Sequence, residues 1–480
     1  MSDKSRIEWT DASWNPVVGC SVVSPGCTNC YAMGQAARIE RMQERALDSV
    51  EARRRSPYAG LTQASKAGPV WNGKVALASD ETMTAPLRWK RPRRIFVNSM
   101  GDLFHEAVPD AWIDQVFAVM ALSPQHTFQV LTKRPKRMRE WFEERWQPAP
   151  ARRIQLGEAS IDLPAEEHGE TRRVQVEREC EPFIQQFNLA DTENNALWTA
   201  GDALKCMQWD WPLPNVWLGV SAERQAEADE RIPDLLATPA AVRFVSCEPL
   251  LGPVDLARIE LVKRVEGSSR GGVHLDVLAG RYVESGMPYV GEWDVDGPCP
   301  EGRAPIRLDW IIAGGESGPN ARPMHVAWVR AIRDQCAAAG TPLFFKQFGE
   351  WAPVCAMSEE AIDACYHPLP EGRWEDATRR EKIESIVLHA DGRRFDGPNR
   401  YGPGAYQQGS GAMLMFKVGK RRAGSALDGV EHKEWPTARA KGREETTAAP
   451  ERSYDVVDMP GGEAIDLPAE FLAETERDAS

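Results

Sequence analysis

The segment LDWIIAGGESGPNARPMHVAWVRAIRDQC, residues 308–336, joins a short apolar run to a helical pattern through a glycine-rich turn. Leu308 to Ala313 is mostly apolar and is typical of a buried parallel strand. From Val326 to Ala339, apolar residues such as Trp328 and Ile332 recur at helical spacing. The segment therefore predicts a strand–turn–helix unit of the kind that builds α/β proteins.

Similar apolar runs occur elsewhere along the chain. They lie at Arg94 to Asn98, Thr127 to Leu131, Val216 to Val220, Val242 to Ser246 and Pro342 to Lys346. Further helical patterns cover Pro109 to Ser123 and Arg224 to Leu236. Because continuous apolar strands occur together with amphipathic helices, we expect an α/β fold with a parallel sheet, closed into a complete or partial (β/α) barrel.

Two polar stretches interrupt the pattern and predict insertions on the barrel, at 142–214 and 257–307. The barrel is then built from residues 1–141, 215–256 and 308–422. Residues 423–480 have the composition of a mostly flexible tail.

The composition limits the possible classes of protein. The 480 residues include 58 Lys and Arg and 71 Asp and Glu, for a net charge of −13, which argues against a protein that coats nucleic acid non-specifically. No apolar run approaches the length of a membrane span, and the first residues lack the apolar core of a signal peptide. We expect a cytoplasmic protein with no membrane partner.

Three of the ten cysteines lie close together, and the other seven are dispersed. Cys20, Cys27 and Cys30 fall in the loop 15–32, where Pro and Gly provide turns. Three thiolates with no adjacent fourth cysteine or histidine suit an iron–sulfur cluster that keeps one iron open, whereas structural zinc prefers four ligands. Zinc with a fourth ligand from elsewhere, such as Cys247 or a histidine, and three unligated cysteines are the alternatives.

This loop resembles the cluster loop of radical S-adenosylmethionine (radical-SAM) enzymes, particularly those similar to spore photoproduct lyase. Its Cys-x6-Cys-x2-Cys spacing is three residues longer than the usual Cys-x3-Cys-x2-Cys. With SPGC followed by NCYA, it is similar to a phage and bacterial family of three-Cys-motif, radical-SAM-like proteins. The resemblance covers most of residues 5–436 outside the two insertions, with further matches at FVNSMGDLFHEAVP, FQVLTKRPKRM, NVWLGVSAERQAEADERIPDLL, RFVSCEPLLGPVDL, PLFFKQFGEW and KRRAGSALDGVEHKEWP.

The resemblance implies a barrel of radical-SAM type in which Cys20, Cys27 and Cys30 hold a 4Fe-4S cluster. The fourth iron would bind the amino and carboxylate groups of S-adenosylmethionine, and reductive cleavage would give a 5′-deoxyadenosyl radical. An electron donor such as a flavodoxin or ferredoxin is implied as a partner. The cofactor-binding positions that the resemblance implies are Ser99, Asp102, Ser221, Glu223, Gly314, Gly315 and Glu316.

Polar residues directly follow the apolar runs, and in barrels such strand ends build the active site. They are Asn98, Ser99 and Asp102; Thr132, Lys133 and Arg134; Ser221 and Glu223; Cys247 and Glu248; Gly314, Gly315, Glu316 and Ser317; and Lys346 and Gln347. The two glycines allow backbone to approach a ligand closely. We expect Glu248 to serve a substrate or cofactor, and Cys247 either to donate hydrogen to a substrate radical or to pack as a small buried residue.

Two basic runs stand out on the acidic chain, at Arg88 to Arg94 and Lys133 to Arg139. Lys133 and Arg134 begin at a strand end, so we expect them to bind substrate phosphate beside the cluster, although a solvated face is the alternative. A nucleic-acid base or nucleotide is therefore the expected substrate. A non-catalytic zinc-binding nucleic-acid module and an enzyme acting on a peptide or partner protein are the rival functions.

Overall fold

A computed structural model of the chain describes residues 5–436 with some gaps. The gaps are residue 6 and the segments 47–55, 145–151, 157–158, 164–170, 188–209, 263–272, 285–290, 295–296, 299–304 and 369–379. Most of the expected tail, residues 437–480, lies outside the described residues. So do Cys206 and Cys299.

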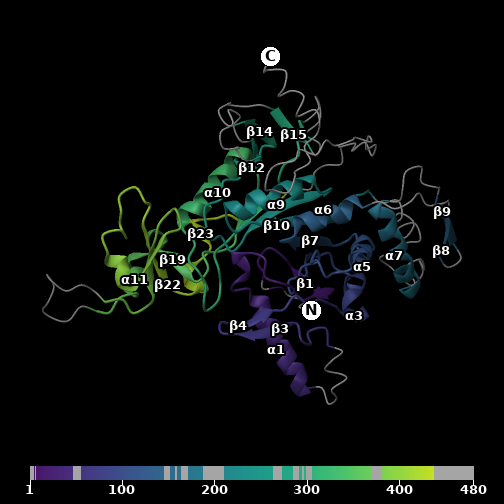
Figure 1. Cartoon of the computed structure of the whole chain (residues 1–480), viewed down its shortest axis with the longest axis horizontal. Coiled ribbons are helices and arrows are strands. Elements are labelled where there is room, and N and C mark those ends of the chain that lie inside the picture. Colours follow the sequence, from purple (N-terminus) through teal and green to yellow (C-terminus); the bar gives the residue numbers. More distant parts are fainter. Residues whose placement is uncertain are drawn as a thin grey trace, which may run out of the picture.

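A seven-stranded parallel sheet forms the centre of the molecule and curls into an open half-barrel (Figure 1). Its strands, in spatial order, are β1 (Ala12–Trp14), β6 (Arg94–Val97), β7 (Thr127–Thr132), β10 (Val216–Ser221), β11 (Val242–Cys247), β17 (Trp310–Ala313) and β18 (Leu343–Phe345). The prediction of an α/β fold with a parallel sheet is confirmed, and the barrel is partial. Strand β1, which pairs with β6 from Ala12 opposite Ile95, was not predicted.

Helices cover one face of this sheet. They are α5 (Asp110–Ala121), α6 (Pro135–Glu143), α9 (Gln225–Ala237) and α10 (Val326–Ala339). Side chains alternate along each strand, so Ile95 and Val97 join the helix-facing core, while Phe96 points to the other face. Each helix follows a strand of the sheet, as the sequence pattern indicates.

Aromatic residues fill the face opposite these helices. The cluster consists of Trp9, Phe96, Phe244, Trp310, Ile312 and Phe344, with Trp435 packed against it. Trp435 stacks on Trp310 with ring centroids 4.8 Å apart, and the Trp310 indole donates a hydrogen bond to the Glu434 carbonyl (2.9 Å). Segments near both ends of the described chain therefore close this face.

Residues 423–436, the first part of the expected tail, are built into the fold. After α12 (Lys420–Ala423), the short hairpin β23 (Ala426–Leu427) and β24 (Val430–Glu431) leads to an extended segment beside β18. There the Phe345 amide donates to the His432 carbonyl (2.8 Å), and the Glu434 amide donates to the Leu343 carbonyl (3.1 Å). This segment covers the open edge of the sheet.

The two interrupting segments carry structure of their own. Between α6 and β10 lie the hairpin β8 (Arg152–Leu156) and β9 (Ala159–Leu163) and the helix α7 (Arg172–Gln186), which packs on α5. Between β11 and β17 lies an antiparallel sheet. Its strands are β12 (Ile259–Val262), β13 (Val273–Asp276), β14 (Arg281–Glu284), β15 (Gly291–Asp294) and β16 (Gly297–Pro298).

The segment 308–422, assigned above to the barrel, continues the barrel only as far as β18. Its remainder forms an antiparallel sheet in the order β19 (Trp351–Pro353), β22 (Met413–Lys417), β20 (Ser385–Leu388) and β21 (Arg394–Asp396). Short helical segments η2 (Val354–Ala356), α11 (Glu359–Asp363) and η3 (Gly397–Tyr401) connect these strands. The alternation of strand and helix therefore ends with α10 and β18.

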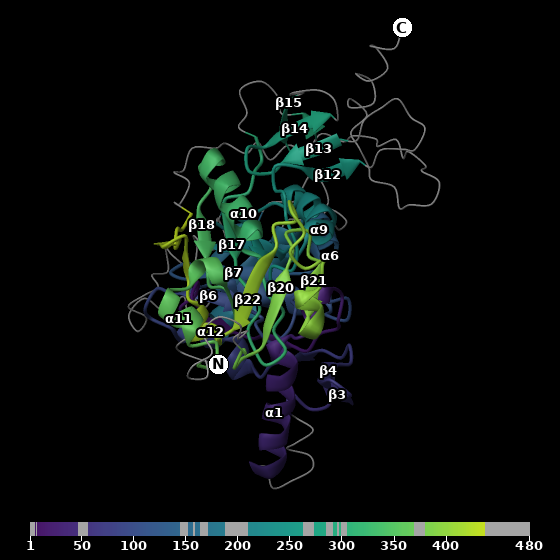
Figure 2. The same ribbon diagram turned by 90° about the vertical axis from the view of Figure 1, so that its left-hand side faces the viewer.

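Further elements lie between β1 and β6 in the chain. They are β2 (Val17–Val18), η1 (Pro25–Cys27), α1 (Tyr31–Ala46), β3 (Thr62–Ser65), β4 (Gly68–Trp71), β5 (Ala76–Leu77), α3 (Asp80–Met83) and α4 (Ala85–Arg88). Helix α1 projects well beyond the sheet in both views (Figures 1 and 2).

Among the described helices, none combines the length and apolar character that crossing a lipid bilayer requires.

Candidate functional site

The three-cysteine loop lies over the carboxyl ends of the parallel strands. It starts beside β6, where the Gly19 amide donates a hydrogen bond to the Met100 carbonyl (3.0 Å). Gly19 has a φ of +95°, and a Cβ atom there would lie 2.2 Å from the Lys74 carbonyl oxygen, so only glycine fits. The turn at the start of the loop therefore requires glycine at position 19.

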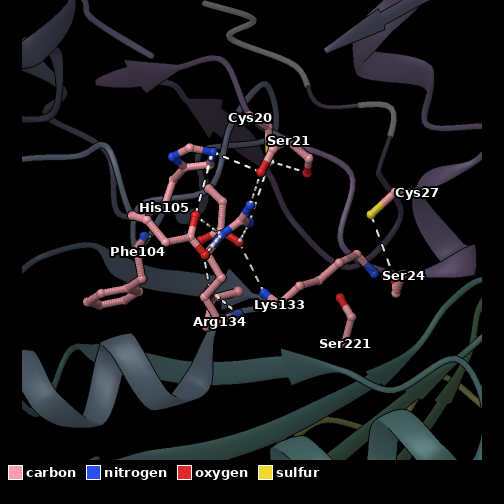
Figure 3. A network of polar contacts seen from close by, with 12 residues as sticks. Cys20, Ser21, Ser24, Cys27, Phe104, His105, Lys133, Arg134 and Ser221 are labelled. Carbon is pink, nitrogen blue, oxygen red and sulfur yellow. Dashed lines mark hydrogen bonds and ion pairs between the residues drawn. The ribbon is translucent and has the colours of Figure 1, made fainter. Parts of the chain in front are cut away.

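Arg134, which follows β7, connects the sheet to the start of this loop (Figure 3). Its guanidinium donates to the Asp102 carboxylate (3.0 Å) and the Ser21 hydroxyl (2.6 Å), and lies 3.6 Å from the Cys20 sulfur. Glu106 pairs with it from the outside (2.8 Å). A buried cation thus lies directly against the first cysteine.

Glu223, which follows β10, fastens the middle of the loop. Its fully buried carboxylate pairs with Lys133 and with Arg231 (3.1 Å), and it accepts a hydrogen bond from the Ser24 hydroxyl (3.1 Å). A Cβ atom on Gly26 would lie 2.2 Å from this carboxylate. Burial lowers the pKa of Lys133 to about 8.

The environments of the three thiols differ. Burial raises the pKa of Cys20 to about 12 and also raises the pKa of Cys30. Burial opposes ionisation of Cys27 as well, but the Lys133 charge and backbone hydrogen bonds outweigh it, so the pKa of Cys27 is lowered. Cys27 is therefore the thiol that ionises most readily.

The three thiols have the chemistry of iron–sulfur cluster ligands. Three thiols come from one loop, and Lys133 and Arg134 offer positive charge to offset thiolates. The sulfurs do not converge: within the described ranges, no three His, Cys, Asp or Glu side chains are grouped to hold a metal ion. Cys27 instead faces the Ser24 hydroxyl, 3.8 Å away (Figure 3).

Glu316, which follows β17, fastens the end of the loop. Its carboxylate accepts hydrogen bonds from the Arg322 guanidinium (2.8 Å) and the Asn29 side-chain amide (3.0 Å). Arg322 also donates to the Pro25 carbonyl (2.9 Å). Burial opposes ionisation of Glu316, but the bonds from Arg322 outweigh it and lower its pKa. The residue expected to bind cofactor therefore holds the loop in this structure.

Glu248 and Lys346, at the ends of β11 and β18, form an ion pair at the same mouth (2.5 Å). Both side chains retain some exposure, unlike Glu223. Burial of the Tyr31 hydroxyl, which bonds to Ser99, raises its pKa to about 12, and the Cys30 and Glu248 charges add to that increase. The pair is therefore partly exposed at the mouth, whereas Glu223 is fully buried.

Ser99 and Ser221 also lie at this end of the sheet. The Ser99 hydroxyl donates to the Asn15 side chain (3.1 Å), and the Ser99 carbonyl accepts a bond from the Tyr31 hydroxyl (3.1 Å). Ser221 is buried beside Lys133 (Figure 3), and its carbonyl accepts a bond from Arg231 (2.8 Å). Both residues border the loop.

Residues 4–436 match the model of a family described as "Protein of unknown function (DUF5131)". The chain belongs to the DUF5131 family. Searches of curated proteins and of solved structures found no match. Family membership therefore spans both the cysteine loop and the strand-end residues, but it assigns no activity to this DUF5131 chain.

Two of the expected site residues, Cys247 and Gly315, have purely structural surroundings. Cys247 is fully buried on the helix-facing side of β11, where burial raises its pKa, as expected for a packing residue. A Cβ atom on Gly315 would lie 2.0 Å from the Phe348 carbonyl oxygen, so its close approach is to backbone rather than to a ligand. Gly314 instead lies beside the ion pair of Glu248 and Lys346, since a Cβ atom there would lie 3.6 Å from the Glu248 carboxyl carbon.

Asp102 is occupied by internal hydrogen bonds. Besides Arg134, its carboxylate accepts bonds from the Thr132 hydroxyl (2.7 Å), the Lys133 amide (3.1 Å) and the Phe104 amide (3.1 Å). A carboxylate with this many donors stabilises the strand end and has little capacity left for a cofactor.

The basic run at 133–139 is also paired. Lys133 and Arg134 pair as above, Arg137 pairs with Asp110, and Arg139 pairs with Asp234 (2.8 Å). Lys133 and Arg134 were expected to bind phosphate, but neither is free to do so in this arrangement. Binding phosphate there requires these carboxylates to release their cations.

Sequence reasoning missed the residues that fasten the loop. Ser24 and Asn29 lie between the cysteines, and Arg322 follows Glu316 by six residues. The polar character of Ser24 and Asn29 was the only sign in the sequence that they hold the loop. Their partners could not be identified, because they are 199 and 287 residues away in the chain.

Proposed function

We propose that this chain is a radical-SAM-like enzyme that modifies or repairs a nucleic-acid base or nucleotide. The observation that carries the proposal is the position of Cys20, Cys27 and Cys30 on one loop over the carboxyl ends of a parallel half-barrel. Active sites of barrel enzymes lie at this end. The resemblance of the loop to radical-SAM cluster loops supports the same assignment.

In this proposal the three cysteines hold a 4Fe-4S cluster, and the strand ends bind S-adenosylmethionine. Bound there, the two groups would supply radical chemistry, in which reductive cleavage of the sulfonium yields a 5′-deoxyadenosyl radical that takes a hydrogen atom from the substrate. Arg134 and Lys133 place positive charge against the loop. Ser24 and Asn29 fix its conformation.

We assign the accessible ion pair of Glu248 and Lys346 to ligand binding. A ligand with an ammonium and a carboxylate, such as the amino-acid end of S-adenosylmethionine, complements both members. Gly314 borders this pair, and Ser99 bonds to Tyr31, whereas Asp102, Glu223 and Glu316 act by holding the loop and the strand ends. An electron donor such as a flavodoxin or ferredoxin completes the proposed reaction.

Anaerobic reconstitution tests the proposal. We expect about four irons per chain and production of 5′-deoxyadenosine from S-adenosylmethionine under reducing conditions, measured by mass spectrometry. Zinc in place of iron, with no cleavage of S-adenosylmethionine, would instead support the zinc-binding module.

A further inference from the structure

Helix α1 begins at the residue after Cys30 and leads away from the mouth of the half-barrel (Figures 1 and 2). Its inner side packs on the hairpin of β3 and β4, where Ala32, Met33 and Ala36 are buried with Trp71. A rise of about 1.5 Å per residue makes this 16-residue helix roughly 24 Å long. The helix therefore connects the cysteine loop to a surface outside the mouth.

The outer side of α1 carries Tyr31, Arg38, Arg41 and Arg45, all exposed. At 100° per residue these four positions fall within an arc of about 80°, so they form one stripe. Within the described residues, none of the three arginines has a carboxylate at ion-pair distance. Arg41 donates a hydrogen bond to the Ala37 carbonyl of its own helix (3.1 Å). Among the described residues, the stripe is therefore a row of arginines without an ion-pair partner, on a chain of net charge −13.

The contrast with the basic run at 133–139 is informative. There Lys133, Arg134, Arg137 and Arg139 are all paired with carboxylates. Cations that carboxylates already neutralise contribute little to binding a polyanion, whereas free arginines release counterions from phosphates. Charge complementarity therefore favours α1 over this run as a phosphate-binding surface.

Tyr31 gives the stripe an aromatic residue at the end nearest the cysteines. It is 57% exposed, and its hydroxyl is held by the Ser99 carbonyl (3.1 Å). A ring fixed at its polar end and open to solvent is a stacking surface for a base. Arginines in a row with an exposed aromatic are the features that bind single-stranded nucleic acid.

We propose that the outer side of α1, defined by Tyr31, Arg38, Arg41 and Arg45, binds a single-stranded stretch of nucleic acid that leads into the mouth. The three arginines contact successive phosphates, and Tyr31 stacks with a base beside Cys30. This inference rests on the proposed function for the chemistry at the mouth, but the binding itself does not require the cluster.

The test measures fluorescence anisotropy of a labelled, mixed-sequence single-stranded 20-mer, as DNA and as RNA, with the full-length cluster-free protein between 50 and 400 mM salt. The Arg38→Ala/Arg41→Ala/Arg45→Ala variant should bind at least tenfold more weakly at 100 mM salt. The slope of log affinity against log salt should flatten by about two, since each single-strand phosphate contact contributes about 0.7. Tyr31→Ala should weaken binding about tenfold with the slope unchanged.

Two controls separate this surface from charge in general. Lys90→Ala/Arg91→Ala removes two exposed cations from the basic run at 88–94 and should leave affinity within twofold of wild type. Arg38→Ala/Arg41→Ala also removes two exposed cations, but from the stripe, and should weaken binding by more than twofold. Arg38→Lys/Arg41→Lys/Arg45→Lys keeps the charge and should keep the salt slope.

The inference is overturned if wild-type protein shows no salt-dependent binding to either oligonucleotide, or if the triple alanine variant binds like wild type. It is also overturned if only an acidic protein such as a flavodoxin binds α1. Iron content and 5′-deoxyadenosine production of the triple alanine variant should match wild type. If wild type takes up no iron, the proposed function fails, whereas the oligonucleotide result still decides the α1 surface.

Discussion

The carboxylate of Glu316 accepts a hydrogen bond from the side-chain amide of Asn29 (3.0 Å). This bond fastens the end of β17 to the residue before Cys30. Together with the bond between Ser24 and Glu223 (3.1 Å), this contact holds the cysteine loop at two points. The conformation of the loop therefore depends on carboxylates of the sheet as well as on its own turns.

Replacing Glu316 should loosen the loop. Glu316→Gln removes a charge-assisted contact with Arg322, an interaction typically contributing about 1.5 to 3 kcal/mol. We expect local opening, and therefore alkylation of Cys20 and Cys30 in the cluster-free protein, to rise roughly tenfold, as measured by peptide mass spectrometry. Glu384→Gln, which alters an exposed pair with Lys417, is the control. Equal labelling in both variants would argue against the fastening role.

Each of the three cysteines should be required for iron binding. We expect Cys20→Ala, Cys27→Ala and Cys30→Ala each to abolish cluster assembly during anaerobic reconstitution, because three thiolates are the minimum for a site with one open iron. Cys355→Ala changes an exposed cysteine outside the loop and should retain about four irons per chain. Full iron content in any of the first three variants removes that residue from the ligand set.

Gly26 and Gly34 offer a matched pair of substitutions. A methyl group on Gly26 would collide with the buried Glu223 carboxylate, whereas nothing lies within 4 Å of the corresponding position on Gly34. Gly26→Ala should therefore displace the loop and reduce iron uptake, with the thermal midpoint nearly unchanged. Gly34→Ala should bind iron normally and gain about 0.5 to 1 kcal/mol from its helical position. Normal iron uptake by Gly26→Ala would mean that the loop tolerates displacement.

Strands in apolar runs that alternate with helical patterns were predictable from the sequence, and strands outside this alternation were not. Val242 to Ser246 is apolar enough to identify a buried strand, and β11 is found there. Strand β1, Ala12–Trp14, is flanked by polar residues and forms no apolar run. The antiparallel sheet containing Ser385–Leu388 was not predicted, because its strands lie outside the strand–helix alternation and are separated by long connections.

Part of the candidate site was likewise predictable from the sequence, and part was not. The spacing of Cys20, Cys27 and Cys30 marks the loop directly, because its three ligands are local in sequence. The use of Glu223 and Glu316 was not predictable, because their partners in the loop are 199 and 287 residues away. A strand-end carboxylate looks the same in sequence whether it binds a ligand or an arginine.

Trp435 should contribute to stability although the sequence assigns it to a tail. Its ring stacks on Trp310, and the Arg94 guanidinium lies 3.9 Å from the ring centroid. We expect Trp435→Ala to lower the free energy of unfolding by about 2 to 3 kcal/mol, somewhat less than for a fully buried tryptophan. Trp435→Phe, which keeps an aromatic ring, should lose less than half of this amount. A urea titration that shows no loss for Trp435→Ala would place the segment outside the cooperative unit.

His325 should make stability depend on pH. Its Nδ1 accepts a hydrogen bond from the Ala327 amide (3.0 Å) at the start of α10, and its Nε2 lies 2.8 Å from the Gly411 carbonyl, to which it donates. Only the neutral ring makes both bonds, and burial lowers the pKa of His325 below its usual 6.5.

The sign of the effect follows from where each state takes up its proton. The unfolded chain protonates His325 near pH 6.5, and the folded chain does so only at lower pH, so the unfolded state binds more protons between these values. Stability should therefore fall as pH decreases through this window. His325→Asn keeps a capping acceptor but cannot titrate, so its free energy of unfolding should be lower at pH 7.5 yet change less between pH 7.5 and 5. Urea titrations of the cluster-free protein test this, with the exposed His367→Asn as the control that keeps the wild-type pH dependence. A wild-type pH dependence in His325→Asn would assign the effect to other groups.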